Sequence, residues 1–258
     1  MPTERRRELS VPDHETRWIR ERARTPAEYD ALLARRAAGE PLQYVVGGWG
    51  FRRLDLFLDG RVLIPRPETE TVVEVAIAEL APLGAGRRRL AVDLGTGSGA
   101  IALSLAAEVP RVSVWATDMS DDALAVARAN IAGAGSPVGT RVRLAQGDWW
   151  QALPSGLRGT IDLIVSNPPY IAANETLPPE VGDWEPGTAL VAGPSGLEAV
   201  ETIIESACDW LARPGRLVME IAPHQAEAAS ALVVGAGFAE AEVFPDLNGR
   251  PRVLVGRV

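Results

Sequence analysis

Hydrophobic residues recur at two different intervals along most of the chain. From about residue 67, short apolar runs alternate with longer segments whose apolar positions return every three or four residues. The short runs predict β-strands and the longer segments predict α-helices. The predicted strands span 90–94, 112–117, 142–145, 161–166, 216–220, 240–244 and 252–256, and the predicted helices span 68–80, 99–108, 121–132, 196–211 and 225–235.

This alternation predicts an α/β fold with a parallel, doubly wound sheet, because parallel neighbours need a crossover helix between them. The last two predicted strands, 240–244 and 252–256, are joined by a short connection. A connection of that length favours an antiparallel pair at the end of the sheet. The pattern therefore predicts a Rossmann-like domain over residues 67–258.

The first 66 residues have a different character. Residues 1–40 are rich in Arg and Glu and predict two short helices, 16–23 and 26–39, the second with Thr25 as N-cap and Gly39 as its stop. This segment is too short for a core of its own, so we expect a small helical cap. Apolar positions around glycines in residues 41–66 predict a β-hairpin linker.

Composition narrows the classes of function. The net charge of -8 and the pI of about 5.0 argue against non-specific nucleic-acid binding, which depends on clustered Lys and Arg. With one cysteine, Cys208, and two histidines, His14 and His224, we expect no disulfide framework and no metal site. The N-terminus lacks the apolar core of a signal peptide and no apolar run could span a membrane, which predicts a cytoplasmic protein without membrane association. The oligomeric state stays open.

The strongest local motif is Asp93-Leu94-Gly95-Thr96-Gly97-Ser98-Gly99, which follows an apolar strand and opens a helix. Such a loop lets the backbone turn sharply and approach a ligand, and Asp118, after the next strand, suits the two hydroxyls of a ribose. The loop alone fits a nicotinamide dinucleotide as well as a methyl donor. Asp93 favours S-adenosylmethionine, because an acid so close would not help a pyrophosphate.

A second acidic position follows the third strand of the predicted sheet. In Gly147-Asp148-Trp149-Trp150, Asp148 suits the amino group of an adenine and Trp149 suits stacking on its ring. The competing interpretation is a surface acid followed by two core tryptophans. The position beside the glycine loop favours the cofactor interpretation.

The segment Asn167-Pro168-Pro169-Tyr170 ends a buried strand and predicts the reacting site. Two prolines stiffen the backbone and donate no hydrogen bonds, which leaves the side-chain carbonyl of Asn167 and the backbone carbonyl of Pro168 as acceptors. Two acceptors facing the N–H bonds of a planar nitrogen would orient it for methylation. Tyr170 suits stacking on a flat amide or base, and Pro169 completes the substrate edge. Asn167 is also predicted to contact the methyl donor.

Together these motifs resemble the HemK/PrmC family of protein-(glutamine-N5) methyltransferases. The resemblance runs from about residue 26 to the end of the chain. Besides the two motifs above, it rests on segments 39–44, 62–70, 185–197 and 246–250, of which Pro65-Arg66-Pro67 is the most specific. About 40 residues precede the hairpin here, whereas the family usually carries a longer N-terminal helical bundle that helps to dock its substrate.

The resemblance implies a seven-stranded class I methyltransferase sheet, S-adenosylmethionine as cofactor and a peptide-chain release factor as substrate, methylated on the glutamine of its Gly-Gly-Gln motif. It implies catalytic roles for Asn167, Pro168 and Tyr170. Arg66 either supports the active-site loop, meets the substrate backbone, or is a surface or salt-bridged arginine without a role in the site. Two alternatives stay open at this point: an N6-adenine methyltransferase of nucleic acid, and a donor-binding protein without transferase activity.

Overall fold

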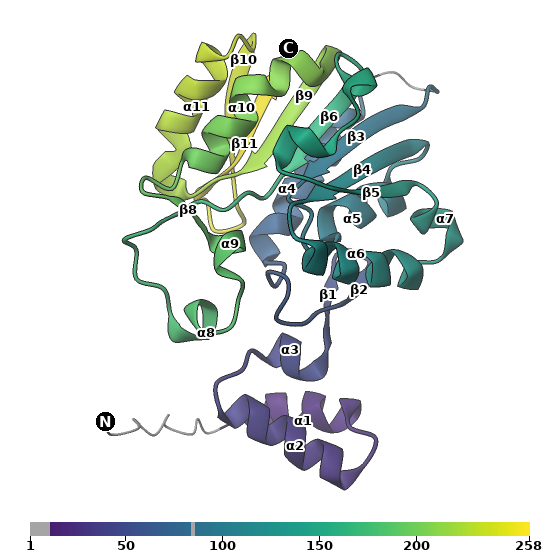
Figure 1. The fold of residues 1–258 in the computed structure, drawn as a ribbon, viewed down its shortest axis with the longest axis vertical. Coiled ribbons are helices and arrows are strands. Elements are labelled where there is room, and N and C mark those ends of the chain that lie inside the picture. Colours follow the sequence, from purple (N-terminus) through teal and green to yellow (C-terminus); the bar gives the residue numbers. More distant parts are fainter. Residues whose placement is uncertain (1–10, 84–85) are drawn as a thin grey trace.

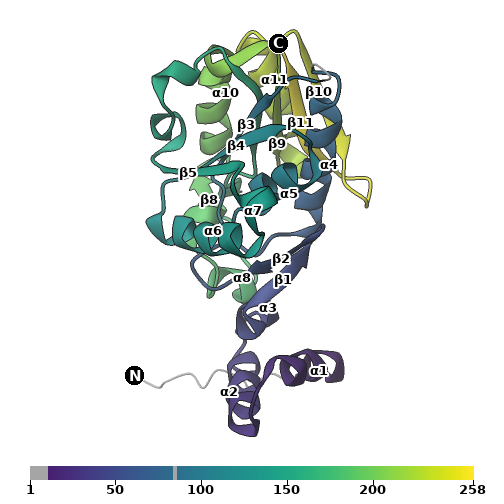
Figure 2. The same ribbon diagram turned by 90° about the vertical axis from the view of Figure 1, so that its right-hand side faces the viewer.

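The computed structural model describes residues 11–83 and 86–258. The first ten residues of the predicted N-terminal segment therefore lie outside the described part of the chain. A large α/β body carries a β-hairpin at one end, and two helices extend beyond the hairpin (Figures 1 and 2). No helix among residues 11–83 and 86–258 is both long and apolar enough to cross a membrane.

The seven strands of the main sheet lie in the order β10-β11-β9-β6-β3-β4-β5. Only β11 runs antiparallel to its neighbours β9 and β10, which confirms the predicted antiparallel finish. The strands are β3 Arg89–Leu94, β4 Val112–Asp118, β5 Val142–Gln146, β6 Ile161–Ser166, β9 Leu211–Glu220, β10 Glu240–Pro245 and β11 Pro251–Arg257.

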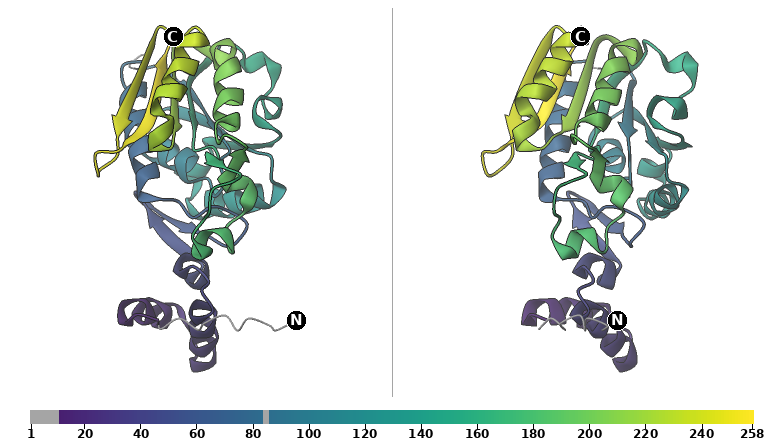
Figure 3. Two further views of the ribbon diagram at one scale, coloured as in Figure 1. Left: turned by 90° about the vertical axis from the view of Figure 1, so that its left-hand side faces the viewer. Right: turned by 60° about the vertical axis from the view of Figure 1, so that its left-hand side comes forward.

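Helices cover both faces of the sheet (Figure 3). Successive residues of each strand point to opposite faces, so neighbouring residues pack in different helical layers. Ala91 packs in the cluster formed with α4, α5 and α6, whereas its neighbour Val92 packs with α10 and α11. The sequence thus predicted both layers from the apolar runs. The helices are α4 Pro67–Leu80, α5 Ala100–Glu108, α6 Asp121–Gly133, α7 Ser136–Gly139, α10 Glu198–Trp210 and α11 Ala226–Gly235.

The N-terminal helices pack on a third short helix rather than on a long hairpin. α1 (Asp13–Arg22) and α2 (Pro26–Ala37) confirm the two predicted helices, and Thr25 caps α2 by accepting from Glu28 N at 3.1 Å. Residues 42–46, predicted within the hairpin linker, instead form α3 (Leu42–Val46). Leu42 and Val45 lie three positions apart and both pack on the buried Ile19, a spacing that only a helix satisfies.

The hairpin itself is short, formed by β1 (Gly48–Phe51) and β2 (Leu54–Phe57). Arg52 in its turn pairs with Glu108 at the end of α5, which fixes the hairpin against the body. The carboxamide of Asn130 on α6 also holds it: Oδ1 accepts from Phe57 N at 2.7 Å, and Nδ2 donates to Phe57 O at 3.1 Å and to Ser98 O at 2.8 Å. One buried side chain therefore connects the hairpin to the glycine loop.

Strand β9 begins at Leu211, five residues before the predicted start at 216, because Pro214 does not interrupt the strand. Pro214 lies where the pairing of β6 with β9 shifts register, between Ile161 opposite Leu211 and Leu163 opposite Arg216. A proline is tolerated at such an irregularity, since no ladder hydrogen bond is required there. Short segments complete the chain: α8 Pro179–Gly182, α9 Gly187–Leu190, and β7 Ile171–Ala172 paired with β8 Val191–Gly193.

Candidate active site

A cavity of about 400 Å³ opens at the carboxyl ends of β3, β4 and β6. The chain leaves β3 for β4 and β5 and returns on the other side of β3 as β6, so the strand order reverses at this point. Ligands of open α/β sheets bind at such a reversal. The predicted site residues that line the cavity are Gly95, Thr96, Gly97, Ser98, Asp118, Asp148, Trp149, Asn167 and Pro169.

Asp93 lies beneath the glycine loop, fully buried at the end of β3. Its Oδ2 accepts from Thr96 Oγ1 at 2.6 Å and from the backbone N–H of Ala102, in the first turn of α5, at 3.1 Å. Gly99, the N-cap of α5, has no side chain to satisfy that N–H, so Asp93 caps the helix instead. Among the described residues, nothing donates to the buried Oδ1 of Asp93.

Burial raises the pKa of Asp93 from its ordinary value of 3.8 to about 7. Because the folded-state pKa lies above the unfolded one, the stabilising contribution of Asp93 is present at low pH. It is lost as the pH rises through about 7. Glu220, discussed below, is raised in the same direction.

We expect Asp93→Asn to gain stability relative to the wild type between pH 5 and pH 8. Both hydrogen bonds fall on one oxygen, so an asparagine can keep them while removing the charge. The gain should reach at most about 3 kcal/mol, since one pKa unit corresponds to about 1.4 kcal/mol. Urea unfolding of both proteins at pH 5, 6, 7 and 8 measures it. Glu220 titrates in both proteins, so the difference isolates Asp93, and a difference independent of pH would contradict the prediction.

Asp118, at the end of β4, joins the glycine loop to the following turn. Its Oδ2 accepts from Gly97 N at 2.9 Å and its Oδ1 from Ser120 N at 2.9 Å. Burial raises the pKa of Asp118 above its ordinary value. Gly97 has a φ of +55°, and a Cβ there would meet no atom within 4 Å, so the loop leaves open space at this point of the cavity wall.

The two neighbouring tryptophans separate into different environments. Trp149 lines the cavity with a φ of 41°, and its ring edge lies 3.6 Å from the position that a Cβ of Gly95 would take. Trp150 turns away, stacks on Trp210 at 5.6 Å and donates through Nε1 to Thr202 O. Asp148 also lines the cavity and is exposed. Both tryptophans are partly buried against the core on this side of the sheet, but of the two only Trp149 lines the cavity.

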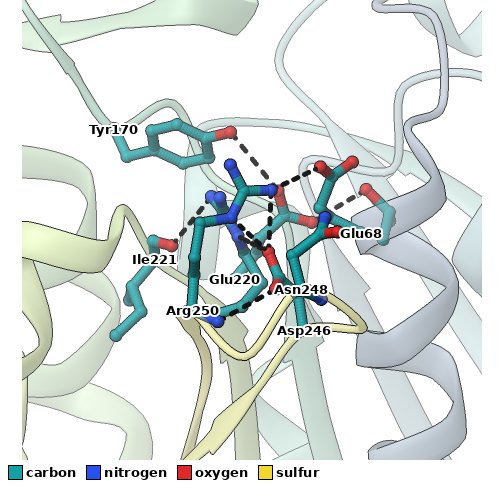
Figure 4. A network of polar contacts seen from close by, with 9 residues as sticks. Glu68, Tyr170, Glu220, Ile221, Asp246, Asn248 and Arg250 are labelled. Atoms are coloured by element: carbon teal, nitrogen blue, oxygen red, sulfur yellow. Dashed lines mark hydrogen bonds and ion pairs between the residues drawn. The ribbon is translucent and has the colours of Figure 1, made fainter.

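The segment 167–170 follows β6 with its four residues in different surroundings. Asn167 and Pro169 line the cavity, and Pro168 between them in the sequence is buried. Asn167 Nδ2 donates to Thr69 Oγ1 at 3.2 Å, which leaves Oδ1 without a donor among the described residues. The hydroxyl of Tyr170 donates to Glu220 Oε1 at 3.3 Å, so this side chain points into a polar cluster at the end of β9 (Figure 4).

The backbone at Tyr170 is held by Gln225, which follows β9, and by the turn after β8. Gln225 Nε2 donates to Tyr170 O at 3.0 Å and to Gly196 O at 2.9 Å. Gly196 has a φ of +82°, and a Cβ there would lie 2.7 Å from Tyr170 O, so only glycine permits this approach. Glu198 accepts from Ser195 N and Gly196 N, which fixes the same turn. The arrangement keeps residues 167–170 rigid.

Arg66 lies outside the main cavity. Its guanidinium pairs with the buried Glu185, which also accepts from Ile64 N at 3.2 Å. Burial raises the pKa of Glu185, and Arg66 opposes that rise. Both residues line a second cavity of about 350 Å³ between the N-terminal helices and the body. Arg66 thus connects the loop before α4 to the segment before α9.

The model of the Methyltransferase small domain family matches residues 76–180. The chain is 45% identical over 237 residues to the release factor glutamine methyltransferase of Cereibacter sphaeroides, which covers 90% of this chain and 80% of the relative. It is 43% identical over 247 residues to the release factor glutamine methyltransferase of Bordetella pertussis, which covers 95% of this chain and 84% of the relative. The chain belongs to the release factor glutamine methyltransferase family.

A solved structure agrees on the fold. The methyltransferase from Pyrococcus furiosus is 20% identical, with a TM-score of 0.55 over 79% of this chain and 88% of that chain. At that identity the likeness concerns the fold alone. Together with the family membership, it confirms the predicted class I methyltransferase sheet.

The methyl donor of the release factor glutamine methyltransferase family is S-adenosylmethionine, and the cavity wall fits it. Asp118 lines this wall with a carboxylate, and the open space at Gly97 admits a close approach to the backbone. Beneath the loop, the buried Oδ1 of Asp93 has no hydrogen-bond partner among the described residues, although Asp93 itself does not line the cavity. When bound, the donor supplies an electrophilic methyl group on a positively charged sulfur.

Sequence reasoning missed two residues of this site. Thr69 lies within segment 62–70 and Glu220 ends a predicted strand, but the sequence alone assigns neither residue a role. An acid that ends the apolar run Leu217-Val218-Met219-Glu220 was the available signal, because a carboxylate at the carboxyl edge of a buried strand needs a polar partner. For Asn130, in the middle of α6, the sequence offered no comparable signal.

Proposed function

We propose that this protein transfers a methyl group from S-adenosylmethionine to the side-chain amide nitrogen of the glutamine in the Gly-Gly-Gln motif of peptide-chain release factors. The observation that carries the proposal is the orientation of Asn167. Its Nδ2 is engaged by Thr69, and the residue lines the cavity that the glycine loop and Asp118 also line. A hydrogen-bond acceptor therefore faces the space where donor and substrate would meet.

The chemistry requires positioning more than a base. An amide nitrogen is a weak nucleophile, since its lone pair is delocalised into the carbonyl group. Asn167 Oδ1 and the backbone carbonyl of Pro168 would accept its two N–H bonds, point the nitrogen toward the methyl group and stabilise the positive charge that develops on it. Methyl transfer makes the N–H acidic, so the proton can leave to water without a dedicated base.

The surrounding residues take supporting roles in this proposal. Asp118 binds the ribose, Asp148 and Trp149 bind the adenine, and the loop 95–99 holds the backbone close to the donor. Pro169 closes the cavity beside the substrate. Tyr170 would act from the edge of the cavity, because its hydroxyl is turned toward Glu220 and the residue does not line the cavity.

We assign methyl transfer to residues 67–258 and docking of the release factor to residues 1–40 together with the linker 41–66. The second cavity supports this division, since it lies between the two parts and is lined by both. Trp18 beside it keeps 43% of its surface exposed while its ring lies 4.9 Å from that of Trp49. An aromatic pair of this kind is typical of protein-binding surfaces. A release-factor substrate would place the protein in the cytoplasm.

Mass spectrometry of a release factor incubated with this protein and S-adenosylmethionine tests the proposal. We expect one added methyl group on the glutamine of Gly-Gly-Gln, and none on a release factor in which that glutamine is replaced by alanine. Parallel reactions with DNA and RNA oligonucleotides that contain adenine serve as the competing substrates. Transfer to an oligonucleotide and none to the release factor would refute the proposal in favour of an adenine methyltransferase.

A further inference from the structure

A line of hydrogen bonds runs from the cavity wall to the buried end of β9. Asn167 Nδ2 donates to Thr69 Oγ1 at 3.2 Å, and Thr69 Oγ1 donates to Glu220 Oε2 at 2.8 Å. The other carboxylate oxygen, Oε1, accepts from the hydroxyl of Tyr170. Glu220 is 1% exposed and Thr69 is 3% exposed, so water competes little for these bonds.

The chemistry of these groups decides which group donates and which accepts in each of these hydrogen bonds. An ionised carboxylate can only accept hydrogen bonds, so the hydroxyl proton of Thr69 must point to Glu220. The lone pairs of Thr69 then face Asn167 and can only accept. Of the two ends of the Asn167 amide, only the NH₂ group can donate to them. The carbonyl end is therefore the one left to face the cavity.

We propose that Thr69 and Glu220 are positioning residues, which fix the amide of Asn167 with its oxygen toward the substrate. The inference rests on the acceptor role of Asn167 in the proposed function. A flipped amide would present two N–H groups to the substrate nitrogen, where it must present an oxygen. Without this direction both orientations of an asparagine amide fill the same volume, so packing alone does not choose between them.

Arg252 favours the ionised form of Glu220, whereas burial and the negative charge of Glu68 oppose it. Arg252, which is 8% exposed, lies near Glu220 and donates through Nη1 to Ile221 O, while its Nε lies 3.8 Å from Asp246 Oδ2. Arg250 binds Asp246 and Glu68 in front of this group (Figure 4). Burial and Glu68 raise the pKa of Glu220, while Thr69, Arg252 and Tyr170 lower it, with a result of about 7. Protonation near neutral pH would release the direction that the carboxylate imposes.

Kinetics of three variants test the inference in the full chain. Thr69→Val keeps the shape without the hydroxyl, Glu220→Gln can donate to Thr69 and reverse the line, and Thr69→Ser restores the hydroxyl. We expect Thr69→Val and Glu220→Gln each to lower kcat by about 10- to 100-fold, as for a small misplacement of a reacting group. KM for the release factor and the dissociation constant of S-adenosylmethionine should change little. Thr71→Val, on the same helix, is the matched control.

Three further kinetic results distinguish positioning from a structural role. Thr69→Ser should recover most of the rate that Thr69→Val loses. The double variant Thr69→Val/Glu220→Gln should be about as slow as either single variant, because Thr69 and Glu220 act through the same amide. In the wild type, kcat should rise with pH through about 7, and this rise should be absent in Glu220→Gln. Equal loss in Thr69→Ser and Thr69→Val, or multiplied losses in the double variant, would overturn the inference.

A measurement without substrate separates this inference from the proposed function. The side-chain NH₂ signals of Asn167 in a ¹⁵N-labelled protein, assigned by their loss in Asn167→Ala, should titrate near pH 7 and shift in Thr69→Val and Glu220→Gln. If these signals respond while no release-factor glutamine is methylated, the proposed function fails. The inferred orientation of Asn167 then remains valid, with another planar nitrogen as the substrate. Signals that ignore both substitutions would overturn the inference whatever the substrate.

Discussion

Asn167→Ala should slow methyl transfer by about 100- to 1,000-fold, the usual effect of removing one preorganised group that stabilises transition-state charge. The side chain supplies an acceptor at the cavity wall, and its NH₂ group is already engaged by Thr69. Alanine removes the oxygen that orients the amide and stabilises the charge on its nitrogen. Donor binding should change by less than about tenfold, because the glycine loop and Asp118 stay in place.

Single-turnover methylation of a release factor, with donor affinity measured by calorimetry, checks this result. Asn174→Ala is a matched control, since it removes the same amide from an exposed position in the same segment. We expect it to transfer methyl groups at the wild-type rate. A variant at Asn167 that retains more than about a tenth of the rate would mean that the Pro168 carbonyl orients the substrate by itself.

Asp118→Ala should weaken the binding of S-adenosylmethionine by about 100-fold or more. Hydrogen bonds to a charged group contribute about 1.5–3 kcal/mol each, and tenfold in affinity corresponds to about 1.4 kcal/mol. The carboxylate also holds Gly97 N and Ser120 N, so its removal releases the loop that the donor must contact. Both effects act in the same direction.

Isothermal titration with S-adenosylmethionine measures the loss, and Asp121→Ala provides the control. Asp121 is exposed at the start of α6, so the same charge is removed without contact to the loop. Its affinity should stay within about twofold of the wild type, as for a screened surface charge. Equal weakening in both variants would show that the effect is electrostatic at long range and that Asp118 does not contact the donor.

The resemblance and the apolar patterning predicted the family and the order of elements because both depend on local sequence. Apolar runs such as Leu163-Ile164-Val165, which are buried on both faces, are typical of strands in a covered parallel sheet. The glycine loop and the segment Asn167-Pro168-Pro169-Tyr170 are each a continuous stretch of sequence, so the backbone constraints in each depend on neighbouring residues. Residues 42–46 show the limit of this reasoning, since their apolar run suits either a strand or a short helix until Ile19 lies beside it.

The sequence by itself determined the sheet, the donor loop and the rigid segment after β6, because strand burial, glycine turns and proline stiffness act within a few residues. Only the tertiary structure decided which way Asn167 points. Thr69 lies 98 residues from Asn167 in the sequence, and Glu220 lies 151 residues from Thr69. No local sequence pattern connects these residues. The direction of a buried hydrogen bond depends on which group at its far end can donate, and that is fixed only when the fold brings the groups together.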